Sequence, residues 1–300
     1  VRASREFQKK EVWAAVQTAG RFAIVSFGDS YWISHVRCNK PYTNGQEEYG
    51  CGQCMPCRIN RARLWIGRMI LESLDHPFSC FVTLTYNDES LPEDWCVHKR
   101  AVQLYLKRLR QELHPRTFRY YAVGEYGDQN WRPHYHLIIF GVSPTEEATL
   151  LKCWSLGFIK VGTCEPHSIS YVCGYITKKM TNPKDSRLEG RLPEFALMSR
   201  KPGIGFGAVN VMYQAYQTIQ GQAVLKEHGW IISKMKASAS TYPLGTYLQK
   251  KLVNKLALTD QQKGEFRYNY IRSLDDDTRA EEKPACYRVF DSYFCRIWRP

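Results

Sequence analysis

The sequence lacks the features by which membrane, secreted and repeat proteins are usually recognised. No stretch reaches the roughly 18 uncharged apolar residues that a membrane helix needs. The apolar stretch over 22–36 is interrupted by Gly28, Asp29 and Ser30 and follows no basic leader, so a signal peptide is not expected. No internal repeat or low-complexity tract is evident. With 300 residues the chain can bury a sizeable core, and we expect a soluble globular protein that does not contact a membrane.

Acidic residues are also in short supply. The 29 Asp and Glu face 42 Lys and Arg, which leaves a formal net charge of +13. A surplus of this size favours a polyanion as the partner, and nucleic acid is the commonest one. The contents of 44% hydrophobic and 24% charged residues are typical of a folded globular chain and exclude a wholly disordered one.

Cysteines are plentiful but odd in number, at 11, so they do not read as a set of disulfides. Cys51, Cys54 and Cys57 form a CxxCxxC motif, and Cys38 lies 13 residues upstream. Zinc prefers four tetrahedral ligands of this kind, so the four thiols predict a closed structural Zn²⁺ site. Free thiols in a reducing cytosol and an iron–sulfur cluster are the alternatives that the spacing leaves open. The other cysteines show no ligand spacing and are expected to be buried as small apolar side chains. They are Cys80, Cys96, Cys153, Cys164, Cys173, Cys286 and Cys295.

Hydrophobic periodicity predicts an α+β core in which helices pack on a central antiparallel sheet. The predicted helices cover 58–74, 101–115, 146–154 and 168–180, and the predicted strands cover 79–87, 118–127, 134–142 and 158–164. A short polar loop joins the second and third strands, which favours a hairpin. The expected organisation is an N-terminal extension (1–34), a Cys-rich zinc knuckle (35–62), the core (63–182) and a mainly helical C-terminal region (183–300) with helices over 214–235 and 247–274.

Two histidines provide the first candidate for chemistry. His134 and His136 are two apart on a predicted strand, so both side chains leave the same face. The hairpin folds Glu125 beside them, and a carboxylate there would complete a His-His-Glu metal site with open positions for water or a phosphate oxygen. Asp128 is a rival third ligand. The alternative is that Glu125 is an ordinary hairpin-end carboxylate paired with Arg132.

Two tyrosines provide the second candidate. Tyr171 and Tyr175 are four apart on a predicted helix, so they share a face. Lys178 and Lys179 follow one turn later. Near an ammonium and a metal, a phenol can lose its proton and attack a phosphorus atom, while the positive charges stabilise the phosphate oxygens. Core packing of the two aromatic rings is the alternative.

Three segments, in this order, resemble the motifs of the HUH endonucleases. They are FVTLTYND (81–88), PHYHLIIF (133–140) and YVCGYITKK (171–179). Together with CGQCMPCRINRARLW (51–65), VGEYGDQNWRPHYHLIIFG (123–141) and MSRKPGIG (198–205), they resemble the replication initiators of gokushoviruses, which are single-stranded DNA phages of the Microviridae.

The resemblance implies an HUH (RRM-like) sheet and a DNA-nicking activity. One tyrosine attacks a phosphate at the replication origin, stays joined to the 5′ end and releases a 3′-OH that primes rolling-circle synthesis. The second tyrosine acts when the origin is regenerated, and the freed hydroxyl closes the circle without ATP. The implied partners are the single-stranded phage origin DNA and the host helicase and polymerase, in the host bacterial cytoplasm.

The resemblance also implies roles for individual residues. His134, His136 and Glu125 would hold Mg²⁺ or Mn²⁺, and Tyr171 and Tyr175 would be the nucleophiles. Lys178 is the expected charge aid. Related initiators often carry Lys just before the second tyrosine, where this chain has Gly174, so the choice between Lys178 and Lys179 stays open.

Basic helices are expected to contact DNA phosphates, which is a salt-dependent interaction without sequence preference. The residues are Arg58, Arg61, Arg63, Lys107, Arg108 and Arg110. Trp131 could stack on an unpaired base near the nick, with packing in the turn as its alternative.

Two other functions fit part of the pattern. A zinc-containing, non-catalytic single-stranded nucleic-acid binding protein would explain the charge, the cysteines and a four-stranded sheet. A metal-dependent hydrolytic nuclease would use activated water and form no covalent intermediate. A protein–DNA adduct that survives denaturation distinguishes transesterification from both.

Overall fold

The computed structural model describes residues 38–45, 48–127, 129–178, 183–219, 221–222, 225, 234–237, 240–262 and 264. These residues divide into two compact units, one within residues 35–208 and one within residues 209–300. None of the helices in the described part of the chain has the length and apolar character needed to span a bilayer.

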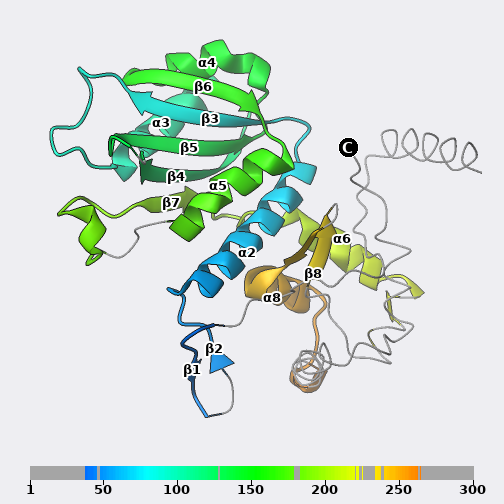
Figure 1. Cartoon of the computed structure of the whole chain (residues 1–300). Coiled ribbons are helices and arrows are strands. Elements are labelled where there is room, and N and C mark those ends of the chain that lie inside the picture. The colour runs from blue at the N-terminus through cyan, green and yellow to red at the C-terminus, as the bar shows by residue number, and fades with distance from the viewer. Residues whose placement is uncertain are drawn as a thin grey trace, which may run out of the picture. The chain divides into compact units, whose positions relative to one another are not determined.

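The first unit is a mixed α+β structure, as the periodicity predicts (Figure 1). Its helices are α2 (Met55–Leu74), α3 (Lys99–Glu112), α4 (Glu147–Lys152) and α5 (Pro166–Lys178), with short 3-10 turns η1 (Pro144–Glu146) and η2 (Ser186–Leu188). Its strands are β1 (Tyr42–Thr43), β2 (Glu48–Tyr49), β3 (Ser79–Tyr86), β4 (Arg119–Tyr126), β5 (Pro133–Phe140), β6 (Gly157–Thr163) and β7 (Phe195–Met198). The predicted helices and strands of the core each match one of these elements to within a few residues.

The central sheet has five antiparallel strands in the order β6-β3-β5-β4-β7, while β1 and β2 form a separate hairpin. The predicted hairpin of the second and third strands is present as β4 and β5, and β5 lies in the middle of the sheet. The fifth strand, β7, comes from beyond residue 182, where the sequence predicts the end of the core. Its four residues, FALM, are too few to show a period and follow a stretch rich in Gly and Pro.

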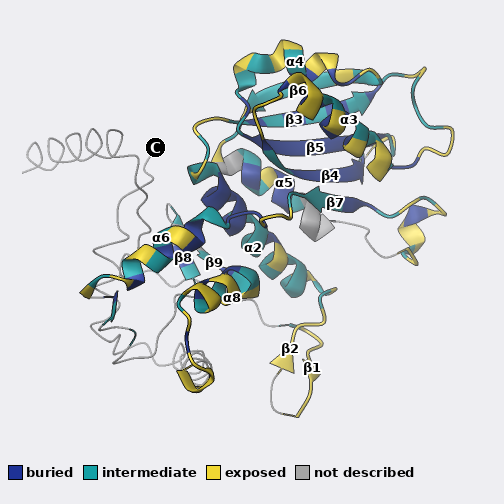
Figure 2. Cartoon of the chain, turned by 180° about the vertical axis from the view of Figure 1, so that it is seen from behind, coloured by how far each residue is buried: buried dark blue, intermediate teal, exposed yellow. Residues whose placement is uncertain are grey.

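One face of the sheet forms the main hydrophobic core with α3. Val82 and Leu84 of β3 and Leu137 of β5 point to this face and are fully buried against Val102 and Leu106 of α3. Strict alternation along β3, with every second side chain buried, produces this arrangement. Figure 2 shows α3 in front of the sheet, whereas α5 lies on the opposite face and is in front in Figure 1.

The other face of the sheet is covered in part by α2 and α5. Trp65 of α2 packs against Tyr121 of β4, with ring centroids 5.2 Å apart. Val172 and Cys173 of α5 are fully buried. Helix α5 contacts β4 and β5 but extends less over β3 and β6, and this difference matters for the site.

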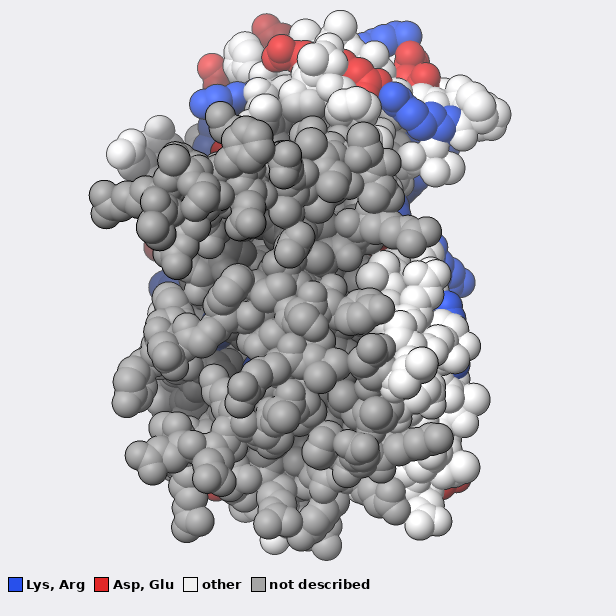
Figure 3. Space-filling model, turned by 90° about the vertical axis from the view of Figure 1, so that its right-hand side faces the viewer, with Lys and Arg blue, Asp and Glu red and all other residues white. Residues whose placement is uncertain are grey.

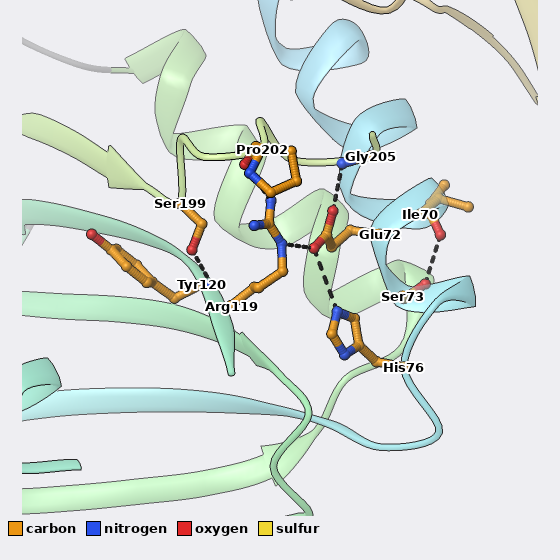
Figure 4. A network of polar contacts seen from close by, with 9 residues as sticks. All are labelled: Ile70, Glu72, Ser73, His76, Arg119, Tyr120, Ser199, Pro202 and Gly205. Carbon is orange, nitrogen blue, oxygen red and sulfur yellow. Dashed lines mark hydrogen bonds and ion pairs between the residues drawn. The ribbon is translucent and has the colours of Figure 1, made fainter. Parts of the chain in front are cut away.

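A buried carboxylate fixes the end of α2 to the sheet and to the segment 198–205 (Figure 4). Glu72 accepts hydrogen bonds from Arg119 Nε and from the Gly205 N–H (2.5 Å), and it lies 3.4 Å from His76 Nε2. Arg119 also donates to the Pro202 carbonyl (2.7 Å). Burial opposes ionisation of Glu72, but the hydrogen bonds from His76 and Gly205 and the Arg119 charge outweigh it, so the pKa of Glu72 is lowered. The MSRKPGIG segment therefore contributes to holding the fold together.

The second unit contains α6 (Gly207–Tyr216), β8 (Lys234–Ala237), β9 (Ser240–Pro243) and α8 (Gly245–Lys255). The predicted helix over 214–235 is wrong at both described ends: α6 stops at Tyr216, and the segment from Lys234 pairs with β9. Thr218 ends the helix, because its hydroxyl donates to the Ala215 carbonyl and accepts from the Gly221 N–H.

The helix predicted over 247–274 is shorter than expected. α8 ends at Lys255, and Ala257 has φ +52°, which an α-helix cannot accommodate. The region is helical as expected, with an added β-hairpin.

Candidate metal centre and active site

The antiparallel register brings Glu125, His134 and His136 together, as the hairpin predicts. Glu125 of β4 lies directly opposite His134 of β5, and directly opposite residues share a face of the sheet. Glu125 Oε1 lies 2.8 Å from His134 Nε2 and 3.0 Å from His136 Nε2. One ligand atom from each residue lies within 4.8 Å of the others, so a single divalent cation could be held. We call these three residues the carboxylate–histidine group.

The second ring nitrogen of each histidine has its own partner. His134 Nδ1 donates to the Arg132 carbonyl (3.1 Å), and His136 Nδ1 lies 2.9 Å from Thr83 Oγ1. Both Nε2 atoms are thereby aimed at Glu125, which is the orientation that a metal-binding imidazole requires. Thr83 was not predicted from the sequence. The only signal for it is alternation along β3, which puts 81, 83 and 85 on the face of the histidines.

The group is buried but charged. Glu125 and His136 are 4% and 5% exposed. Burial opposes ionisation of Glu125, but hydrogen bonds from both imidazoles outweigh it and lower its pKa. Burial also opposes protonation of His134, but Glu125 and then the Arg132 carbonyl outweigh it and raise its pKa, with a smaller contribution from Glu194.

Two further observations bear on the third ligand. The alternative pair of Glu125 with Arg132 is wrong, because Arg132 donates to the Tyr86 carbonyl (2.9 Å) and pairs with Asp88 (2.8 Å). The rival ligand Asp128 lies outside the described residues. Glu194, a buried carboxylate that accepts from the Tyr126 N–H, was missed because it lies beyond the predicted core.

The residues present fit a divalent metal. Two imidazoles and one carboxylate leave coordination positions for water or substrate oxygen, which is the pattern of a catalytic rather than a closed structural site. This donor set suits Mn²⁺ and Zn²⁺, and also Mg²⁺ when water completes the shell.

The first tyrosine of α5 lies beside the carboxylate–histidine group. The Tyr171 ring centroid is 5.6 Å from that of His136 and 6.0 Å from that of Phe81, which itself stacks on His136 at 5.7 Å. Tyr171 is 47% exposed, so core packing does not account for it. Tyr175 follows one turn later on α5, and Lys178 is the last residue of the helix. The side chains of these two, and the whole of Lys179, lie outside the described part of the chain.

The four predicted zinc ligands also meet. Cys38, Cys51, Cys54 and Cys57 place their sulfur atoms within 4.8 Å of one another, and the Cys38 and Cys54 sulfurs are 3.6 Å apart. Tetrahedral zinc with Zn–S bonds of about 2.3 Å separates its sulfurs by about 3.8 Å. The β1–β2 hairpin brings Cys38 back to the motif, and Gly52, with φ +75°, makes the turn between the last three ligands.

The environment of the thiols favours ionisation at one of them. Backbone hydrogen bonds from Asn39 and Cys57 lower the pKa of Cys54 to about 6, so it is a thiolate at neutral pH. Burial raises the pKa of Cys57 to about 12, and a bound divalent cation would reverse that effect. Cys54 precedes α2 and Cys57 lies in its first turn, where the helix dipole favours negative charge.

The remaining cysteines agree in most cases with the expectation of burial. Cys80, Cys96, Cys153 and Cys173 are buried, while Cys164 is only half-buried. Cys286 and Cys295 lie outside the described residues.

The predicted DNA-contacting residues fall into two groups. Arg58, Arg61 and Arg63 lie on α2, which is on the same side of the sheet as α5, and Arg61 is exposed. Lys107, Arg108 and Arg110 lie on α3, which covers the opposite face of the sheet from the carboxylate–histidine group.

The α3 residues are partly engaged elsewhere. Arg108 donates to the Cys153 carbonyl (3.3 Å), and Arg110 lies over the Phe118 ring at 5.4 Å. Figure 3 shows acidic and basic side chains interspersed at the α4 end of the molecule, where Lys152 pairs with Glu112. The structure therefore does not bring the α3 cations to the metal site.

Trp131 adopts the packing alternative. It is half-buried, lies 5.9 Å from the Tyr126 ring and has the Arg191 guanidinium 5.0 Å above it. This environment explains the residue without a bound base.

Comparison with known proteins agrees with the site. Residues 79–180 match the family model of the replication-associated protein ORF2. The chain is 32% identical over 162 residues to the Replication-associated protein VP4 of Bdellovibrio phage phiMH2K, which covers 46% of this chain and 50% of that protein. It is 31% identical over 198 residues to the Replication-associated protein ORF2 of Spiroplasma virus 4, which covers 58% and 61%.

A third relative, the Replication-associated protein ORF4 of Chlamydia phage 1, is 25% identical over 151 residues, covering 43% of this chain and 38% of that protein. The chain spans about half the length of the curated relatives it matches. The predicted resemblance is confirmed: in the region that builds the carboxylate–histidine group and the tyrosine helix, the chain is similar to replication-associated proteins of Microviridae phages.

Proposed function

We propose that the chain is a rolling-circle replication initiator of a single-stranded DNA phage, and that it nicks and rejoins DNA as an HUH-type endonuclease. The observation that carries this proposal is the position of Tyr171. Its ring lies 5.6 Å from that of His136, on the helix that covers the face bearing the three candidate metal ligands. A nucleophile half-exposed to solvent beside a divalent-metal site is the arrangement that phosphoryl transfer requires.

In the proposed reaction, Tyr171 is the first nucleophile. Its phenol oxygen, after losing its proton to solvent, forms a bond to the scissile phosphorus, and the bond from phosphorus to the 3′ oxygen breaks. The 3′ oxygen takes up a proton and leaves as the hydroxyl that primes synthesis. A divalent cation held by Glu125, His134 and His136 would act as a Lewis acid on the phosphate oxygens. Lys178 would stabilise the same negative charge.

The second transfer repeats this chemistry on Tyr175. The tyrosine attacks the regenerated origin phosphate, and the 3′-OH that this step frees attacks the Tyr171 phosphodiester to close the circle. Each step breaks one phosphoester bond and forms another, so no ATP is needed. One helical turn between the tyrosines supports the use of one site by both.

The four thiols before and within α2 are proposed to hold a structural Zn²⁺. Such an ion would fix the N-terminal end of α2, where Arg58, Arg61 and Arg63 are proposed to contact DNA phosphates. Copying from the new 3′ end requires a helicase and a polymerase, so host replication proteins in the bacterial cytoplasm are the proposed further partners.

The test uses the full chain and the single-stranded form of the genome that encodes it, with Mn²⁺. The products are separated on a denaturing gel. We expect a protein–DNA adduct that survives denaturation and disappears in a Tyr171→Phe/Tyr175→Phe double variant. His136→Ala should abolish nicking and leave salt-sensitive DNA binding in place. Tyr120→Phe, which alters a tyrosine away from the group, is the matched control and should form the adduct.

Other outcomes would contradict the proposal. Cleavage without an adduct would indicate a hydrolytic nuclease that activates water. A gel shift without cleavage would indicate the non-catalytic binding protein.

A further inference from the structure

The edge strand β6 presents an open surface beside the carboxylate–histidine group. Ile159 and Val161 of β6 pack against the core on the α3 face of the sheet. Phe158, Lys160 and Gly162 alternate with them and therefore lie on the other face, the one that carries the candidate metal ligands. We call these three residues the β6 platform.

The register links the platform directly to the metal ligands. Thr85 of β3 lies opposite both Phe158 of β6 and His134 of β5, so the three residues form one row across the sheet. Lys160 belongs to the next row, two strands from the second histidine. Because neighbouring strands are about 4.8 Å apart, the β6 backbone lies about 10 Å from the β5 backbone.

The platform is open. Phe158 is 68% exposed, although polar residues are usual on the solvated face of an edge strand. Lys160 is exposed and makes no ion pair or hydrogen bond with any residue that the structure describes. A side chain added at Gly162 would meet no atom within 4 Å. An open aromatic ring next to an unpaired ammonium is the combination that binds the base and the backbone of an unpaired nucleotide.

We infer that the β6 platform binds single-stranded DNA next to the scissile phosphate, with Phe158 stacked on a base and Lys160 on a neighbouring phosphate. This inference rests on the proposed function for the identity of the strand. It also supplies a cation on the correct face of the sheet, which the basic residues of α3 do not. Stacking tolerates any base, so the platform would hold the strand and would not read its sequence.

The test compares two oligonucleotides of equal length, one of thymidine and one with an abasic backbone. Binding of the full chain is measured by fluorescence anisotropy without added Mg²⁺ or Mn²⁺, so that no strand is cut. Phe158→Ala should weaken binding of the thymidine oligomer by about tenfold and leave binding of the abasic oligomer unchanged. Phe158→Trp should restore it. Lys160→Ala should weaken both equally and reduce the salt slope by about 0.7.

Phe78→Ala is the matched control, because Phe78 is 59% exposed but lies at the opposite end of β3 from Thr85. It should bind like the unaltered chain. Equal binding of the thymidine oligomer by Phe158→Ala and the unaltered chain would overturn the inference, as would equal losses on both oligomers or no binding by the unaltered chain. A base-dependent loss without any covalent adduct on the denaturing gel would uphold the platform and contradict the nicking mechanism. An adduct with no base-dependent loss would do the reverse.

Discussion

Thr83 and His136 face each other across the β3–β5 ladder, and Thr83 Oγ1 lies 2.9 Å from His136 Nδ1. A metal at His136 Nε2 requires the ring proton on Nδ1, and the threonine hydroxyl is the acceptor placed for it. Thr83 thus contributes to the candidate site without touching the metal.

Removing this hydroxyl should weaken metal binding. We expect Thr83→Val to reduce the affinity for Mn²⁺ about tenfold, since ligand-orienting hydrogen bonds have effects of this size. Thr83→Ser should retain the affinity. Titration calorimetry on the folded protein gives the measurement independently of nicking.

Thr85→Val is the control for this prediction. Thr85 lies on the same face, opposite His134, but its hydroxyl makes no hydrogen bond to the residues that the structure describes. If Thr83→Val and Thr85→Val bind Mn²⁺ equally well, the orienting role of Thr83 is refuted.

The four-thiol cluster should hold about one zinc per chain, and Cys54→Ser should lower that content, as measured by elemental analysis. Cys164→Ser, at a half-buried thiol outside the cluster, should not.

The metal-free protein should show unequal thiol reactivity at pH 7. Cys54, with a pKa of about 6, is then mostly thiolate, while Cys57, with a pKa of about 12, is protonated. Iodoacetamide should therefore modify Cys54 first, as read by mass spectrometry, and zinc should protect both. Equal rates for the two thiols in the metal-free protein would contradict the assigned environment.

Glu72→Gln should destabilise the first unit by about 3 kcal/mol at pH 7, because it leaves the Arg119 charge without its buried partner. The folded-state pKa of Glu72 is lowered, so its contribution is complete above the unfolded-state pKa of about 4.3 and is lost as the pH falls through the folded-state value. The difference in free energy of unfolding between the two proteins should thus be full at pH 7 and shrink below about pH 4. Urea titrations at several pH values measure it.

Glu112→Gln serves as the comparison for Glu72. Its carboxylate pairs with the exposed Lys152, and surface pairs contribute at most about 1 kcal/mol. A similar loss in both variants would mean that the network of Figure 4 has no special weight.

Two glycines of β6 should respond oppositely to alanine. Gly157 has φ +148°, and an added Cβ would overlap the backbone of Thr85 and Asn87, so Gly157→Ala should cost about 3 kcal/mol. Gly162→Ala meets open space and should be close to neutral. Thermal unfolding of the two variants decides the matter, and equal midpoints would argue against the described course of β6.

Much of the site follows from the sequence because its parts are local. The two-residue spacing of His134 and His136 fixes a common face, and a short loop forces Glu125 back beside them. The four cysteines are similarly brought together by one hairpin and one turn. These arguments need only the period of a strand and the length of a loop.

The missed features depend on which strands are neighbours. Thr83 and Phe158 join the site only because β3 lies between β5 and β6, an order that no local pattern in the chain specifies. Glu194 and β7 reach the sheet from a Gly- and Pro-rich stretch that looks like a boundary. On α3, amphipathicity correctly predicted a basic outer surface but could not indicate which face of the sheet the helix would cover.

The central position of β5 has a consequence for the timing of the proposed reaction. An outer strand can detach by breaking one ladder, whereas β5 must break two, so we expect its amides to be among the slowest to exchange with deuterium. Both imidazoles are carried on this strand. An initiator that stays joined to its genome for a full round of copying needs a reaction centre that outlasts that wait, and the last strand to open is a suitable place to keep it.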